Sequence, residues 1–176
     1  YFPPEAAGYY SAGSIVGKAF LFLPLAVAQV LFPKASASHA RAERTLGLLN
    51  QSVLATLAVL VAAAAAAWIL APWIILTLFG RAFLNAETLL LVRCFGPALA
   101  PLALVYVVMQ YNLAVQHGRI AWFLAADIPV LAAVVAAYHP SLLGVLAALA
   151  ANHLVLFAAV YAATLGGVRV PERPSR

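Results

Sequence analysis

The chain has 176 residues, of which 66% are hydrophobic and 9% are charged, and its formal net charge is +5. Soluble domains carry about 25% charged residues, so this composition excludes an ordinary soluble fold, which needs a polar surface that the sequence does not supply. We therefore predict an integral membrane protein.

Five apolar segments are long enough to cross a bilayer, because a hydrocarbon core of about 30 Å requires roughly 20 helical residues. They cover residues 9–32, 52–79, 88–115, 120–138 and 141–165. The unbroken alanine run 62–67 favours helices, since strands of a membrane barrel alternate apolar and polar residues. The sequence predicts an all-α membrane bundle over residues 1–168 and a cytoplasmic tail over 169–176.

Basic residues collect in alternate gaps between these segments. The first gap, the third gap and the tail hold Lys34, Arg41, Arg44, Arg119, Arg169, Arg173 and Arg176, whereas the second and fourth gaps hold only Arg81. The positive-inside rule therefore predicts a multi-pass protein of the cytoplasmic (inner) membrane, with its N-terminus outside and its C-terminus in the cytoplasm. The positive charge then reflects topology and contact with anionic membrane lipid, and no nucleic-acid partner is expected.

The first segment carries two features inside its apolar run. Gly13 and Gly17 form a small-xxx-small pair, which predicts close packing against another helix. Lys18 lies at membrane depth, roughly 10 to 14 Å below the outer boundary at about 1.5 Å per residue.

Arg93 lies at a similar depth in the third segment. A lone charge in hydrocarbon costs a few kcal/mol, so Lys18 and Arg93 are tolerable if they line a wet cavity or share an anion. This favours a substrate-binding role for both. The alternative is that each side chain snorkels outward or pairs with a carboxylate such as Glu87.

The last two segments face each other across a turn at His139 and Pro140, which places Asp127 level with Asn152 and His153. An Asp beside an imidazole can share a hydrogen bond or relay a proton, as carboxylate and histidine groups do inside transporters. The alternative is a hydrogen bond from Asn152 to Asp127 that only bridges the two helices.

The other histidines, His39, His117 and His139, belong to loops on both sides of the membrane and do not converge with His153. The single cysteine, Cys94, has no partner for an internal disulfide. We expect no metal site and no cofactor. The chain starts at Tyr1 without the features of a signal peptide, and an outside N-terminus implies at least one further helix before it.

Five runs carry a family resemblance: 7–13, 22–24, 30–36, 78–83 and 116–119, beginning with Ala7-Gly8-Tyr9-Tyr10-Ser11-Ala12-Gly13 and ending with Gln116-His117-Gly118-Arg119. In their order and spacing they resemble polysaccharide and O-antigen flippases of the multidrug, oligosaccharidyl-lipid and polysaccharide exporter superfamily. The resemblance implies two six-helix lobes around a central cavity. This chain would supply five helices of the second lobe, with the N-terminal lobe of the same protein as its partner.

The resemblance also implies a transporter rather than an enzyme. Its cargo would be a lipid-linked glycan diphosphate, flipped across the membrane by alternating access. Three alternatives stay open: a cation-coupled multidrug exporter of the same superfamily, a membrane-embedded glycan-modifying enzyme and a non-catalytic membrane subunit. In the exporter, Asp127 and His153 would perform the coupling.

Overall fold

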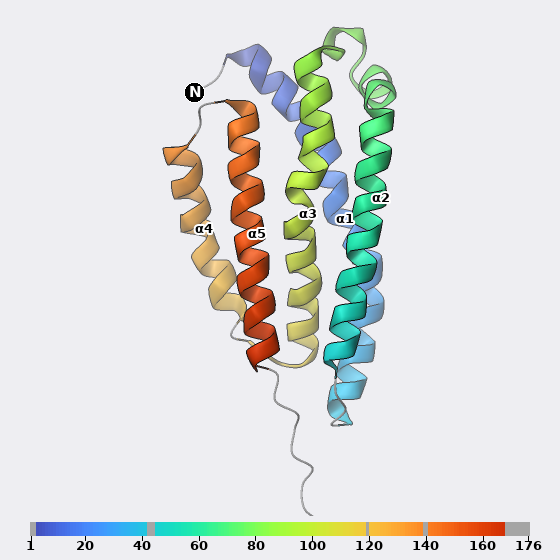
Figure 1. The fold of residues 1–176 in the computed structure, drawn as a ribbon, viewed down its shortest axis with the longest axis vertical. Coiled ribbons are helices and arrows are strands. Elements are labelled where there is room, and N and C mark those ends of the chain that lie inside the picture. The colour runs from blue at the N-terminus through green and yellow to red at the C-terminus, as the bar shows by residue number, and fades with distance from the viewer. Residues whose placement is uncertain (1–2, 42–44, 119, 139–140, 168–176) are drawn as a thin grey trace, which may run out of the picture.

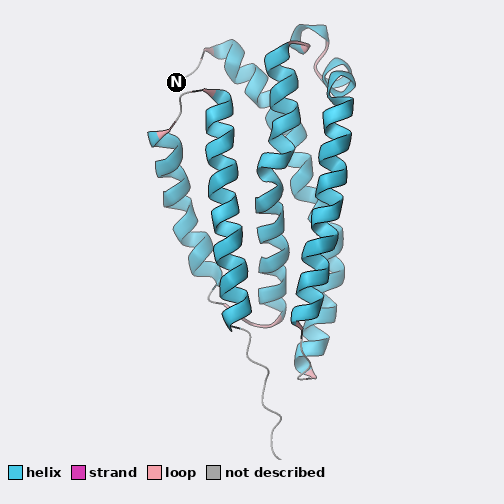
Figure 2. Ribbon diagram, viewed as in Figure 1, coloured by secondary structure: helices cyan, strands magenta, loops and turns pink. Residues whose placement is uncertain are grey.

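A computed structural model describes residues 3–41, 45–118, 120–138 and 141–167. Within these ranges the chain is helical and contains five helices that are long and apolar enough to cross a membrane, which confirms the predicted all-helical class and the order of the five segments. The helices are α1 (Pro4–Ala40), α2 (Leu46–Leu78), α3 (Ala86–Ala114), α4 (Ile120–Ala137) and α5 (Leu142–Gly167), with a short 3-10 helix, η1 (Arg81–Phe83), between α2 and α3 (Figures 1 and 2). The predicted tail at 169–176 lies outside the described residues.

The helices extend beyond several of the predicted limits. At 37 residues, α1 is longer than predicted at both ends. At about 1.5 Å per residue it is about 55 Å long, which exceeds a hydrocarbon core of about 30 Å. Pro4 begins it favourably, because the first helical residue needs no backbone N–H. An apolar run marks only the part of a helix that can lie in hydrocarbon, so it does not predict polar extensions such as Ser36 to Ala40.

Helix α3 occupies the middle of the bundle. It packs against α1, α2 and α5, whereas α4 packs mainly against α5 at the edge (Figure 1). In its most apolar stretch 61% of the residues of α3 are buried, against 6% for α4. Tertiary contacts therefore concentrate on one helix.

The closest approach is between α1 and α3, and glycines make it possible. A Cβ at Gly13 would lie 3.1 Å from the Leu91 Cβ, and one at Gly17 would lie 2.8 Å from the Phe95 Cβ. Across the same interface, the Phe20 ring occupies the space beside Gly96. The predicted packing role of Gly13 and Gly17 is confirmed.

Buried polar contacts tie the helices together at the opposite end of α3. The Thr45 and Tyr111 hydroxyls are 2.6 Å apart, and Asn112 Nδ2 donates to Thr164 Oγ1 at 2.8 Å. All four residues are buried. Pairing satisfies the hydroxyl groups and Asn112 Nδ2, which would be costly to bury alone, whereas Asn112 Oδ1 has no hydrogen-bond partner among the described residues.

The alternating helix directions place Lys34 and Arg41, near the end of α1, at the opposite end of the bundle from Arg81 in η1 (Figure 1). The described basic residues of the first gap and of the second gap therefore lie at opposite ends of the bundle, as the charge pattern predicts. Arg44, Arg119 and the tail arginines lie outside the described residues.

Candidate functional site

Arg93 extends from α3 toward α2. Asn85 fixes the start of α3, since its Oδ1 accepts a hydrogen bond from the Thr88 N–H at 2.8 Å. About two turns later, Arg93 Nε donates to the Trp68 carbonyl at 3.1 Å, and Arg93 Cζ lies 5.2 Å from the centroid of the Trp68 ring. Trp68, rather than Glu87, is therefore the partner of this cation in the structure.

This contact leaves much of the guanidinium available. Only Nε donates a hydrogen bond among the described residues, so the two terminal nitrogens keep their N–H donors for a ligand. The ring face of Trp68 attracts the positive charge of the guanidinium but accepts no hydrogen bond from the terminal N–H groups, which point outward in the guanidinium plane. Arg93 is thus held at one edge and open at the other.

Arg93 lines a cavity of about 440 Å³ between α2, α3 and α5. We call it the Arg93 cavity; its lining is Trp68, Arg93, Cys94, Pro97, Ala98, Leu143, Leu146, Ala147 and Ala150. The volume falls within the range of ligand pockets, about 300 to 1,000 Å³. One cation among apolar walls suits a ligand with an anionic group and an apolar part, because the low dielectric strengthens the charge interaction.

Lys18 lies at a similar level but on another surface. The contacts of Gly13 with Leu91 and of Gly17 with Phe95 set α1 parallel to α3, so Lys18 and Arg93 differ little in depth. Gly17 faces α3, however, and the next residue points about 100° away on a helix. Lys18 is consequently exposed and does not line the Arg93 cavity.

The structure pairs Asp127 with Asn152. Asn152 Nδ2 donates to Asp127 Oδ1 at 2.8 Å, which confirms the predicted bridge between α4 and α5. Membrane helices commonly use such polar pairs for association.

His153 points elsewhere. It is 4% exposed, and it lies close to the backbone of Ala98 on α3 while also interacting electrostatically with Asp127. Its Nδ1 has no hydrogen-bond partner among the residues that the structure describes. The interaction with Ala98 places His153 on the α3 side of α5, and His153 does not line the Arg93 cavity.

Sequence analysis did not single out Trp68. An aromatic residue in an apolar segment carries no sign of its partner, and the contact with Arg93 depends on how α2 and α3 are rotated about their axes. The antiparallel order of the two segments was the one available signal, because it places the last turns of the second, which include Trp68, beside the first turns of the third, which include Arg93.

No group of three or more His, Cys, Asp or Glu side chains capable of holding a metal ion forms within the described ranges. His139, one of the histidines considered above, lies outside them.

No protein-family model, curated protein or solved structure matches this chain. The functional assignment therefore depends on the geometry of the bundle and on the residues that it exposes.

Proposed function

We propose that the chain crosses the cytoplasmic membrane five times and forms part of a transporter that flips lipid-linked oligosaccharide or polysaccharide precursors. The observation that carries this proposal is the Arg93 cavity, in which a partly unpaired guanidinium lies among apolar walls. The five helices support membrane insertion by their length and composition.

The depth of Arg93 supports a role in binding. Arg93 lies about 10 Å along α3 from Ala86, so a bilayer matched to this helix would surround it with hydrocarbon. A guanidinium at that depth is costly unless it has polar partners, and within the described part of the chain only Nε is hydrogen-bonded. A diphosphate supplies several anionic oxygens, and the planar guanidinium binds such groups through two parallel hydrogen bonds.

Lys18 would provide a second cationic contact from a different direction. It is exposed on the outside of α1, where contact with lipid at this depth would be unfavourable. We propose that this face of α1 borders a hydrated space shared with the N-terminal lobe. Arg93 and Lys18 would then contact the diphosphate in different states of alternating access.

Export of the glycan by cells carrying the intact protein tests these roles. We expect Arg93→Ala to reduce export strongly and the Arg93→Ala, Lys18→Ala double variant to abolish it. Arg93→Lys should retain part of the activity, because it keeps the charge and loses the bidentate geometry. Arg81→Ala is the matched control, since Arg81 is an exposed cation at an end of the bundle. Export at the wild-type level in the double variant would exclude both residues from binding.

Membrane threading needs its own measurement. Reporter fusions at Ala37 and Tyr138 should report opposite sides of the membrane, because these residues lie at the ends of α1 and α4. Fusions that report one common side would overturn the proposed topology whatever the export assay shows.

A cation-coupled multidrug exporter is the second candidate, and His153 favours it. A buried imidazole with an unpaired Nδ1 near Asp127 can exchange a proton. Deleting the gene would then sensitise cells to drugs, and His153→Gln would reproduce the effect. A flippase predicts loss of surface glycan with unchanged drug susceptibility.

A further inference from the structure

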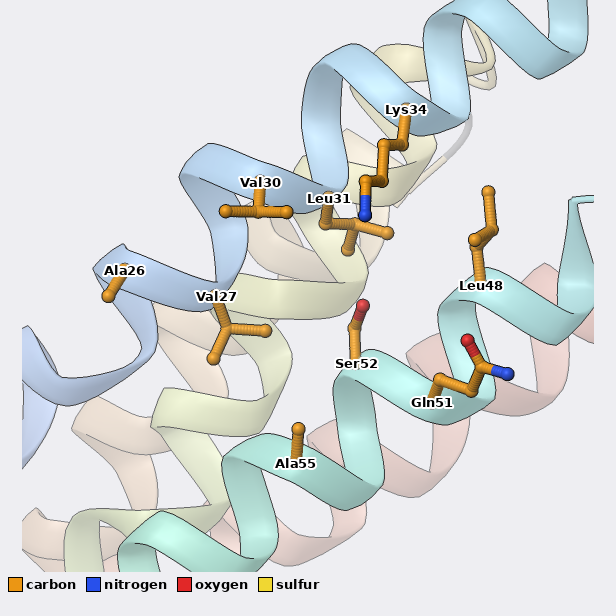
Figure 3. A pocket seen from close by; sticks show the side chains of 9 residues that line it. All are labelled: Ala26, Val27, Val30, Leu31, Lys34, Leu48, Gln51, Ser52 and Ala55. Carbon is orange, nitrogen blue, oxygen red and sulfur yellow. The ribbon is translucent and has the colours of Figure 1, made fainter.

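A second cavity lies between α1 and α2, near the end of the bundle where α1 finishes (Figure 3). Its volume is about 420 Å³. We call it the Lys34 groove; its lining is Ala26, Val27, Val30, Leu31, Lys34, Leu48, Gln51, Ser52 and Ala55. It shares no residue with the Arg93 cavity.

The groove has a polar end and an apolar length. The Lys34 ammonium and the Ser52 hydroxyl point toward the gap between the two helices, and Gln51 lies one residue before Ser52 on α2 (Figure 3). From Lys34 the apolar lining continues to Ala26, which is about 12 Å along α1 at 1.5 Å per residue. Val30 in the middle of this stretch is 54% exposed, so the groove opens on the outer surface of the bundle.

The charge at the polar end is positive. Lys34 is the ionisable residue of the lining. The carboxylates among the described residues lie elsewhere: Glu5 and Glu87 are in the first turns of α1 and α3, and Asp127 is bonded to Asn152. A cation beside a hydroxyl, at one end of an apolar groove, complements a phosphate ester attached to a hydrocarbon chain.

We propose that the Lys34 groove binds an anionic phospholipid. Lys34 and Ser52 hold the phosphate, and an acyl chain lies along Val30, Val27 and Ala26. The proposal rests on the membrane insertion proposed above, which places Lys34 at the cytoplasmic boundary of the bilayer, where anionic lipids are concentrated. It does not depend on the cargo of the Arg93 cavity.

Native mass spectrometry of the full chain in detergent tests the proposal with three probes: phosphatidylglycerol, phosphatidylcholine with the same acyl chains, and glycerol phosphate. We expect phosphatidylglycerol to remain bound at concentrations where phosphatidylcholine dissociates. Glycerol phosphate should not displace it, because the soluble headgroup lacks the acyl chain. Equal retention of phosphatidylglycerol and phosphatidylcholine would overturn the proposal. Displacement of bound phosphatidylglycerol by glycerol phosphate would also overturn it.

Two pairs of variants separate charge from shape. Lys34→Gln should weaken phosphatidylglycerol binding about fivefold to tenfold, as expected for the loss of one charged contact. Its control, Arg81→Gln, removes the same charge at the other end and should bind normally. Val30→Trp fills the groove while keeping Lys34 and should also weaken binding. Its control, Val130→Trp, alters a valine of α4 that is 50% exposed, close to the exposure of Val30.

The outcomes separate a failure of the lipid site from a failure of the proposed transport roles. They also separate a bound lipid from a second copy of the chain in the groove. Equal binding by Lys34→Gln and Arg81→Gln would overturn the lipid site and leave the export result for Arg93 unaffected. A dimer of the chain that excludes lipid and is broken by Val30→Trp would show that a second copy fills the groove, which also overturns the proposal. Normal glycan export in the Arg93 and Lys18 variants would exclude these two residues from cargo binding and leave the lipid site unaffected.

Discussion

Two helix pairs in this bundle associate in different ways. Helices α1 and α3 approach closely through glycines, with Gly17 against Phe95 and Phe20 against Gly96. Helices α4 and α5 are joined by the hydrogen bond from Asn152 to Asp127, and α4 is largely uncovered. Burial does not follow apolar character, since the mean hydropathy is 2.1 for α4 and 1.8 for α3, yet α3 is the more buried helix.

The difference shows that apolar character does not drive these contacts. In a bilayer an apolar side chain gains little by leaving lipid for protein, so association depends on shape, small residues and polar pairs. α3 offers Gly96 and a complementary surface to α1. α4 offers Asp127 and few buried side chains, so it stays at the edge of the bundle.

The largest expected effect concerns the close pair. Gly17→Ala places a methyl group 2.8 Å from the Phe95 Cβ, which the backbone of α3 holds in place. Overpacking of this kind costs about 2 to 3 kcal/mol. The free energy of unfolding in mixed detergent micelles, measured by SDS titration, should fall by that amount.

Gly47→Ala is the control for Gly17→Ala. A Cβ at Gly47 meets no atom within 4 Å, so the substitution should leave stability equal or slightly higher through helix propensity. Equal effects of the two substitutions would show that α1 and α3 do not depend on close approach.

A smaller effect is expected at the polar end of α3. Tyr111→Phe removes the 2.6 Å contact and leaves the buried Thr45 hydroxyl without its partner, which costs about 1 to 2 kcal/mol. Thermal unfolding followed by circular dichroism should show a lower midpoint. Tyr138→Phe changes a tyrosine that is 56% exposed and should leave the midpoint unchanged. Matching midpoints for both variants would contradict the role of the Thr45 contact.

The smallest effect belongs to the edge pair. Asn152→Ala removes the bond to Asp127, and polar pairs between membrane helices contribute about 0.6 kcal/mol on average. Protease accessibility of α4 should increase while the unfolding of the other helices changes little. Asp127→Asn keeps an acceptor oxygen and should behave like the wild type. Unchanged accessibility in Asn152→Ala would show that this bond does not hold α4 in place.

The features that depend on position along the chain could be predicted from the sequence. Five apolar runs predicted five helices, the Gly13 and Gly17 spacing predicted a close contact, and counting from the turn placed Asp127 level with Asn152. Each of these follows from helix rise and local composition, which neighbouring segments do not alter.

The direction in which each side chain points depends on how the helices pack, and the sequence did not predict it. Residues change direction by about 100° per position, and a helix that is apolar on all sides carries no pattern that marks its inner face. This is why depth alone grouped Lys18 with Arg93, and why Asn152 and His153 shared one prediction. Packing on α3 turned Arg93 toward Trp68, Lys18 outward and His153 toward Ala98.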